Sequence, residues 1–184
     1  GYEVIVFDHH QGEEELPSAV AIVNPNRYDE TTEYRYLAAV GVTFLALVAL
    51  HKTLREAGYF AQRKEPDLLA LLDIVALGTV CDVVPLKGLN RAFVVQGLKI
   101  LAQKHNAGLA ALLAVGGVED APTPYHLGFV LGPRINAGGR VGQADLGVQL
   151  LTCDDFEQAH SLAEQLDLHN RERKAIESQV QEAA

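Results

Sequence analysis

Two short apolar runs open the chain, and the later segments mostly have the apolar spacing of helices. Residues 3–7 (EVIVF) form a β-branched run that ends in Asp8, and residues 19–23 form a second run that stops at the triplet Asn24-Pro25-Asn26. Short apolar runs of this kind are typical of buried strands in a parallel sheet. We therefore predict an α/β fold with a parallel sheet, mostly helical after its first strands.

The remaining apolar segments predict a series of helices. Gly58 ends the first of them, and Pro66 opens the next at its first turn. Asp154 and Glu157 form a capping box for a long final helix, whose apolar stripe thins beyond Asp167. That stripe consists of Phe156, Ala159, Ala163 and Leu166. The predicted helices span residues 36–57, 66–77, 89–103, 108–115, 123–131 and 144–151, followed by the final helix.

Composition and charge exclude several classes of protein. The chain has 184 residues, of which 48% are hydrophobic and 21% charged, as in ordinary globular domains. Its net charge of −9 excludes a basic coat for nucleic acid, although a local basic groove remains compatible with it. The longest uncharged apolar stretch, residues 37–50, is too short to span a membrane, and no signal peptide precedes the first strand. Two isolated cysteines favour a reduced, cytoplasmic protein, and the absence of methionine suggests a piece of a longer chain.

The tripeptide Asp8-His9-His10 is the first candidate site, because it follows a strand directly. Ligands of open α/β sheets gather at the carboxyl ends of strands. A carboxylate and two imidazoles at that point can bind a divalent metal, or a metal and a phosphate together. The alternative is a polar strand end with solvated histidines, and a tripeptide by itself favours that alternative.

Asp82 is the second candidate, in the apolar segment 78–85 (GTVCDVVP). A carboxylate buried among valines needs a partner, and a metal ion is a suitable one. The alternative is an aspartate that caps a helix or a turn, and the segment alone leaves both interpretations open.

The glycine-rich segment 132–142 (GPRINAGGRVG) is the third candidate, with Arg134, Asn136 and Arg140. Glycines let backbone amides approach a phosphate closely, and arginines bind phosphate with two parallel hydrogen bonds. The alternative is a flexible linker between helices, although linkers favour serine and glycine over arginine.

Together these segments resemble a known family. The order of DHH, GTVCDVVPL and GPRINAGGR is similar to that of the DHH phosphoesterases, and specifically to the RecJ exonucleases among them. Residues 23–26 (VNPN) and 170–173 (NRER) also look like that family, so the resemblance covers essentially the whole chain. It implies the C-terminal part of a DHH-type catalytic domain in residues 1–151. Residues 152–184 would form a long connecting helix toward a substrate-binding domain that this sequence does not contain.

The resemblance also implies roles for individual residues. His9 and Asp82 would be metal ligands, with Asp8 orienting the histidine or ligating weakly, and His10 would face the scissile phosphate. The segment with Arg134, Asn136 and Arg140 would hold substrate phosphates. We therefore expect the His9 and Asp82 side chains to converge within about 6 Å, since ligands lie about 2 Å from a shared ion. We also expect Arg134 or Arg140 to face the same cleft as His10.

The activity that the resemblance implies is hydrolysis of DNA in repair and recombination. The whole protein would be a 5′-to-3′ exonuclease on single-stranded DNA that releases mononucleotides with two Mn²⁺ or Mg²⁺ ions. Alternatives are a DHH phosphoesterase acting on short oligonucleotides or another small phosphate compound, and a binding module without turnover. The family's upstream aspartate-rich motifs are missing from this sequence. We therefore expect the chain alone to be inactive and to expose an apolar face beside residues 3–7.

Overall fold

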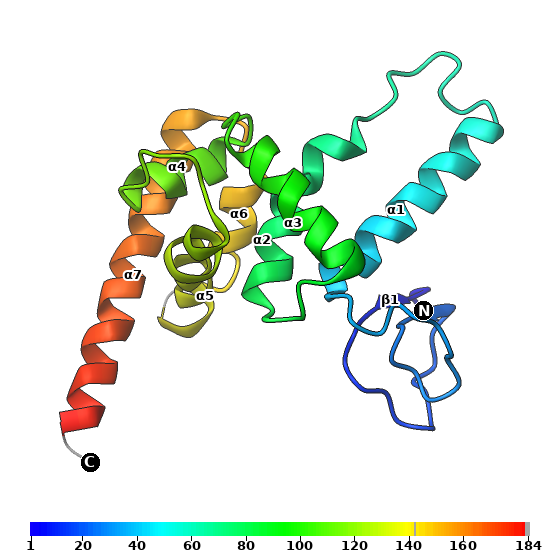
Figure 1. Ribbon diagram of the computed structural model, residues 1–184, viewed down its shortest axis with the longest axis horizontal. Coiled ribbons are helices and arrows are strands. Elements are labelled where there is room, and N and C mark those ends of the chain that lie inside the picture. The colour runs from blue at the N-terminus through cyan, green and yellow to red at the C-terminus, as the bar shows by residue number, and fades with distance from the viewer. Residues whose placement is uncertain (142, 183–184) are drawn as a thin grey trace. The chain divides into compact units, whose positions relative to one another are not determined.

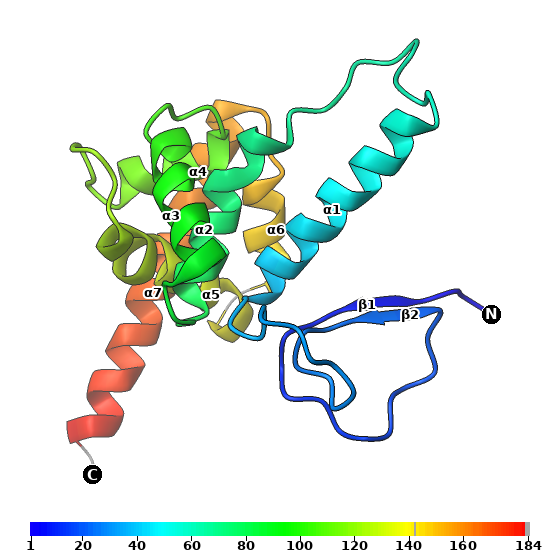
Figure 2. The ribbon, with the colours of Figure 1, turned by 45° about the vertical axis from the view of Figure 1, so that its right-hand side comes forward.

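The computed structural model describes residues 1–141 and 143–182, which fall into two compact units. The first unit is Gly1–Gly97, and the second begins at Leu98. Figure 1 follows the chain by colour from one unit to the next, and Figure 2 separates the two strands from the helix that follows them. None of the described helices is both long and apolar enough to cross a bilayer.

A two-stranded parallel sheet begins the first unit. β1 (Ile5–Phe7) pairs with β2 (Ala21–Val23), with Ile5 opposite Ala21 and Phe7 opposite Val23. Both predicted strands are therefore confirmed, although each is two residues shorter than its apolar run. The prediction that they are buried is wrong for this chain, because Ile5 is 56% and Phe7 40% exposed. No further strand pairs with them within the described residues, so the expected apolar face beside residues 3–7 is open.

The hydrophobic core of the first unit lies among its helices, and the sheet lies beside that core. α1 (Ala39–Glu56) begins three residues later than predicted and ends just before Gly58, whose positive φ of 73° is the expected stop. Phe44 of α1 packs edge-to-face on Phe93 of α3 (Gly88–Leu101) at 5.4 Å between ring centroids. A Cβ on Gly97 would lie 2.1 Å from the carbonyl oxygen of Leu72, so α3 packs with its backbone against that residue.

The segment that carries Asp82 is helical for longer than predicted. A 3₁₀ turn, η1 (Leu68–Leu71), is capped by the Asp67 carboxylate, which accepts a hydrogen bond from the backbone N–H of Leu69 at 3.0 Å. α2 (Leu72–Cys81) then continues four residues beyond the predicted end at 77. Asp82 is consequently the C-cap residue of α2 and lies in the turn that follows this helix, so of the two capping alternatives the turn is confirmed and the N-cap is wrong.

The described residues of the second unit form helices joined by loops and no strand. α4 (Ala107–Val115), α5 (Gly132–Val141) and α6 (Leu146–Leu151) pack against α7 (Phe156–Glu182). A π-helical turn, η2 (His126–Leu131), runs directly into α5. The buried leucines among the described residues of this unit are Leu101, Leu109, Leu112, Leu113, Leu127, Leu131, Leu146, Leu150, Leu162 and Leu166.

The glycine-rich segment is the main correction to the predicted fold. Residues 132–141 are a helix, whereas the sequence suggested a phosphate-cradling loop or a linker; residue 142 lies outside the described residues. The physical reason is close packing against α7. A Cβ on Gly138 would lie 2.8 Å from Cδ2 of Leu166, so the missing side chain lets the two helices approach. The peptide N–H groups of this segment are thus mostly committed to helical hydrogen bonds.

The final helix follows the prediction with small shifts. Its N-terminal cap is Asp155 and not Asp154, since the Asp155 carboxylate accepts from the backbone N–H of Gln158 at 2.7 Å. Ala159, Ala163 and Leu166 are buried as predicted, but Phe156 is exposed. Beyond Asp167 the apolar side chains are exposed; they are Leu168, Ile176 and Val180. The role of residues 152–184 as a connector to a further domain stays a prediction.

Candidate functional site

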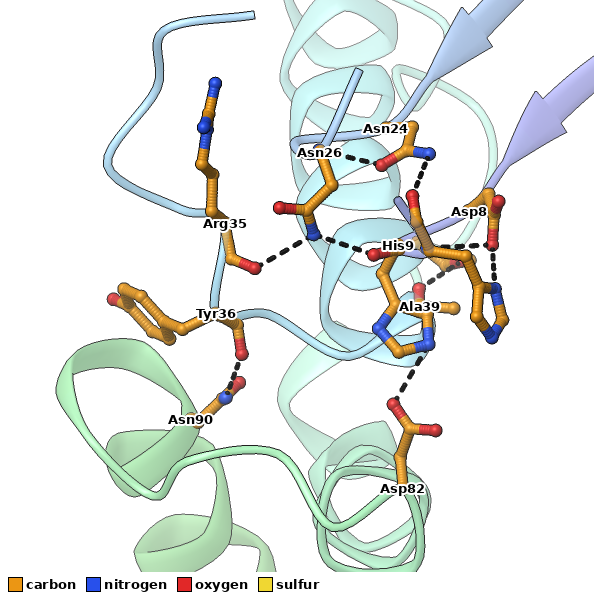
Figure 3. Close-up of polar contacts among 11 residues, drawn as sticks. Asp8, His9, Asn24, Asn26, Arg35, Tyr36, Ala39, Asp82 and Asn90 are labelled. Carbon is orange, nitrogen blue, oxygen red and sulfur yellow. Dashed lines mark hydrogen bonds and ion pairs between the residues drawn. The ribbon is translucent and has the colours of Figure 1, made fainter. Parts of the chain in front are cut away.

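His9 and Asp82 meet within the first unit, although they are distant in sequence. His9 follows β1, Asp82 caps the C-terminus of α2, and His9 Nε2 lies 3.1 Å from Asp82 Oδ2 (Figure 3). The predicted convergence of the two side chains is therefore confirmed. The His9 side chain is only 15% exposed, whereas Asp82 is more open to solvent. The pair thus joins a largely buried imidazole to a more exposed carboxylate.

The Asp8 carboxylate engages the ring of His10 rather than the ring of His9. The Asp8 Oδ1 atom lies 2.7 Å from His10 Nδ1 and also accepts from the backbone N–H of His10 at 3.3 Å. The hydrogen bond from the His10 side chain is the main reason that the pKa of the Asp8 carboxyl lies below its ordinary value. Asp8 is thus ionised at neutral pH and orients the His10 ring through Nδ1. That ring is 78% exposed, with its Nε2 atom turned away from Asp8.

Two asparagines at the end of β2 hold the peptide that carries both histidines. Asn26 Nδ2 donates to the His9 carbonyl at 2.7 Å and to the Arg35 carbonyl at 3.0 Å. Asn24 Nδ2 donates to the His10 carbonyl at 2.9 Å, and Asn24 Oδ1 accepts from the backbone N–H of Asn26 (Figure 3). In the sequence these asparagines mark the end of the second apolar run and belong to the family resemblance, and no role at the site was predicted for them. The signal that could have found them is the parallel pairing, because strand ends of a parallel pair lie at the same edge.

Asn90 fixes the turn that follows Asp82. It is fully buried, and its Nδ2 donates to the carbonyls of Tyr36 at 2.7 Å and Pro85 at 3.0 Å. The Tyr36 hydroxyl in turn accepts from the backbone N–H of Leu89 at 3.2 Å. A Cβ on Gly88, which has a φ of 50°, would lie 2.3 Å from that hydroxyl, so only glycine fits there. These contacts tie the Asp82 turn to the segment that leads into α1.

The chemistry of the pair suits a divalent cation. Imidazole nitrogen and carboxylate oxygen are accepted ligands of Mn²⁺, and adjacent ligands of an octahedral ion with bonds of about 2.1 Å lie about 3 Å apart. The separation of 3.1 Å between His9 Nε2 and Asp82 Oδ2 fits that arrangement. Burial raises the pKa of the neighbouring Cys81 thiol to about 11, so this thiol stays protonated at neutral pH. Among residues 1–141 and 143–182, no cluster of three or more ligating side chains is present, so the pair is a partial ligand set.

We expect Asn26→Asp, in the full-length protein, to weaken Mn²⁺ binding about tenfold. The change keeps the size of the side chain but removes the amide donors that hold the His9 and Arg35 carbonyls, and loss of such supporting hydrogen bonds costs about 10–100-fold in metal affinity. A Mn²⁺ titration followed by electron paramagnetic resonance measures it. Asn106→Asp is the matched control, because Asn106 Nδ2 also donates to a carbonyl, that of Leu151, but in the second unit. Equal affinities for wild type and Asn26→Asp would contradict the prediction.

In the second unit, Arg134 is committed to a buried ion pair. Its Nε and Nη2 atoms each lie 2.9 Å from Asp167 Oδ1, and Nη1 donates to the Val130 carbonyl at 2.7 Å. Arg171 contacts the other carboxylate oxygen of Asp167. The Arg134 side chain is only 15% exposed, so the structure uses it to join α5 to α7. The phosphate-binding role that the resemblance implied for Arg134 has no support in these contacts.

Asn136 and Arg140 lie differently from Arg134. Both are exposed on α5, and they line a pocket together with Pro133 of the same helix and Arg173 and Glu177 of α7. The structure therefore keeps two of the three predicted phosphate-binding side chains accessible. Whether Arg140 faces the same cleft as His10 concerns both units and stays a prediction.

Comparisons with known proteins give a consistent answer over nearly the whole chain. Three curated relatives are named single-stranded-DNA-specific exonuclease RecJ. The protein of Dickeya dadantii is 48% identical over 98% of this chain, that of Escherichia coli 47% over 98%, and that of Thermus thermophilus 35% over 96%. The chain covers 32%, 32% and 24% of these relatives, so it spans about a third of their length or less. No family model matches the chain.

Solved structures agree with the sequence relatives. A crystal structure of exonuclease RecJ bound to manganese superposes with a TM-score of 0.81 at 34% identity, over 97% of this chain and 43% of that one. RecJ from Thermus thermophilus in complex with Mg²⁺ gives a TM-score of 0.72 at 32% identity, over 97% of this chain and 25% of that one. Metal-bound proteins thus share the fold in which His9 and Asp82 meet.

Proposed function

Because this chain is a RecJ-type segment, similar to RecJ exonucleases over nearly all of its own length, we propose that the protein to which it belongs is a metal-dependent exonuclease. Its substrate is single-stranded DNA, which it degrades from the 5′ end to mononucleotides. The observation that supports this proposal most directly is the approach of His9 Nε2 to Asp82 Oδ2 at 3.1 Å. Two motifs that are distant in sequence come together there and would provide a ligand pair for Mn²⁺ or Mg²⁺.

In this proposal His9 and Asp82 hold one ion, and further ligands come from other parts of the whole protein. Bound divalent ions supply an activated water and neutralise charge on the departing oxygen. His10 has a different task, because its ring is exposed and its Nδ1 atom is bound to ionised Asp8. Its Nε2 atom remains available to the scissile phosphate. Asn24 and Asn26 keep both histidines in position by donating hydrogen bonds to the backbone carbonyl groups of His10 and His9.

The proposal places the protein on DNA in the cytoplasm, where repair and recombination use single strands. The negative charge of the chain is compatible with this, since binding of a strand requires only a local positive surface. On α5 and α7, Arg140 and Arg173 provide such a surface. No membrane partner forms part of the proposal.

Degradation of end-labelled DNA by the full-length protein tests the proposal. With Mn²⁺, we expect mononucleotides to be released from the 5′ end of a long single strand, while a blunt duplex and a 5′-blocked strand remain intact. Activity on dinucleotides but not on long strands would favour the phosphoesterase of small phosphate compounds. Absence of hydrolysis on every substrate would favour a binding module, and either of these results would overturn the proposal.

The 184-residue chain alone is the second arm of the same assay. We expect no turnover from it, because its described residues offer no cluster of three ligating side chains around the His9–Asp82 pair. Robust exonuclease activity of this chain would show that ligands from elsewhere in the protein are not needed.

A further inference from the structure

The two proposed metal ligands, His9 and Asp82, lie on segments that no backbone hydrogen bond joins within the described residues. The direct polar contact between residues 8–10 and 82–88 is the approach of the two side chains at 3.1 Å. Each segment is instead fastened, through an asparagine side chain, to the peptide of residues 35–36 that leads into α1 (Figure 3). We call residues 35–36 the spacer peptide.

Asn26 and Asn90 fasten the spacer peptide in the same way, from opposite sides. Asn26 Nδ2 donates to the His9 carbonyl at 2.7 Å and to the first carbonyl of the spacer peptide at 3.0 Å. Asn90 Nδ2 donates to the Pro85 carbonyl, in the turn after Asp82, at 3.0 Å and to the second carbonyl of the spacer peptide at 2.7 Å. An amide nitrogen carries two hydrogens. Each asparagine therefore uses one hydrogen for a ligand segment and the other for the spacer peptide.

The burial of Asn90 shows that its amide donors are what it contributes. The residue is fully buried, and its Oδ1 atom has no hydrogen-bond partner within the part of the chain that the structure describes. An unpartnered buried oxygen lowers stability, so a leucine of similar size would suit the core alone at least as well. The Tyr36 hydroxyl, which accepts from the backbone N–H of Leu89 at 3.2 Å, is a further attachment of the spacer peptide on the Asp82 side.

We propose that the spacer peptide fixes the distance between His9 and Asp82, and that Asn90 is a positioning residue for the metal site, acting through this peptide. The inference rests on the proposed function, because the ion is the one that the exonuclease would use. Asn26, the spacer peptide and Asn90 form a single path of contacts from one ligand segment to the other, and loss of any member breaks that path. Ligands held at a fixed distance bind an ion more tightly, since little conformational freedom is lost on binding.

Titration of the full-length protein with Mn²⁺ alone, followed by electron paramagnetic resonance, tests the inference without turnover. We expect Asn90→Leu to weaken Mn²⁺ binding about tenfold, because loss of a residue that supports a ligand costs about 10–100-fold in metal affinity. The replacement also removes the unpartnered oxygen, so the metal-free variant should remain folded, which circular dichroism checks. Tyr36→Phe removes only the hydroxyl that holds Leu89, and it should weaken Mn²⁺ binding by a smaller factor.

Combining Asn90→Leu with Asn26→Asp distinguishes a single path from two separate supports. We expect the double variant to bind Mn²⁺ about tenfold more weakly than wild type, as each single variant does, because either change already breaks the path. Two separate supports would instead multiply to a loss of about a hundredfold. Thr79→Val is the matched control, because Thr79 is fully buried in the same unit and its Oγ1 donates to a carbonyl outside the path, that of Val75, at 2.7 Å. We expect this control to bind Mn²⁺ like wild type.

An unchanged Mn²⁺ affinity in Asn90→Leu, a hundredfold loss in the double variant, or an equal loss in Thr79→Val would overturn the inference. If Asn90→Leu did not fold, Tyr36→Phe combined with Asn26→Asp would decide by the same comparison. If wild type degrades single strands while Asn90→Leu keeps the wild-type Mn²⁺ affinity, the role of the spacer peptide fails and the exonuclease stands. If the variants lose Mn²⁺ affinity as expected but wild type degrades no substrate, the exonuclease fails and the role of the spacer peptide stands.

Discussion

Asp82→Asn in the full-length protein should lower the rate of hydrolysis of single-stranded DNA by at least two orders of magnitude. It should also reduce by one the number of Mn²⁺ ions that the protein binds. The variant has the same shape but lacks the carboxylate charge that faces His9 Nε2. Loss of a residue that merely supports a ligand costs about 10–100-fold, so loss of a ligand should cost at least about 100-fold. The measurements are the rate of mononucleotide release and the number of Mn²⁺ ions bound, by electron paramagnetic resonance.

Asp29→Asn is the control for this experiment. Asp29 is an exposed aspartate of the same unit, and its only described ion pair, with Arg27, lies on the surface. We expect its rate and its Mn²⁺ binding to equal those of wild type. If the Asp82→Asn variant bound as many Mn²⁺ ions as wild type, Asp82 would not be a metal ligand, even if the rate of DNA hydrolysis fell.

The strands could be predicted because they depend on a strong local pattern, whereas the approach of His9 to Asp82 was expected only from the family resemblance. Apolar β-branched runs indicate strands, and a polar tripeptide directly after one of them marks the functional edge of a sheet. The position of Asp82 at the C-terminus of α2 could not be predicted in the same way. The chain leaves that helix through Val83, which has a φ of 58°, and a valine gives no sequence signal for a left-handed residue.

The glycine-rich helix shows the opposite limit of sequence reasoning. Residues 132–141 have low intrinsic helix propensity, and a local pattern therefore favours a loop. Their helical structure depends on contacts with α7, where Gly138 permits close approach to Leu166 and Arg134 reaches Asp167. Those partners lie about thirty residues later in the chain, so no local pattern reveals them. The same long-range contacts decide which arginine is structural and which remains accessible.

Replacing Asp167 by alanine should destabilise the second unit by about 3–5 kcal/mol, the cost of breaking a buried ion pair by removing one partner. Asp167 is almost fully buried and contacts both Arg134 and Arg171. Its removal leaves the guanidinium of Arg134 largely buried without a carboxylate, between α5 and α7. Urea denaturation of the full-length protein, monitored by hydrogen exchange within the second unit, measures the loss of stability.

Two variants determine whether the ion pair is the cause. Glu164→Ala removes an exposed carboxylate from the same helix and should cost less than about 1 kcal/mol, because its ion pair among the described residues, with exposed His160, lies on the surface. Arg134→Met combined with Asp167→Leu removes both charges together, and it should recover most of the lost stability, because apolar side chains of similar volume can replace a buried ion pair. If Asp167→Ala left stability unchanged while Arg134→Ala flattened the salt dependence of DNA binding, Arg134 would be a phosphate ligand after all. The structural role that its contacts indicate would then be wrong.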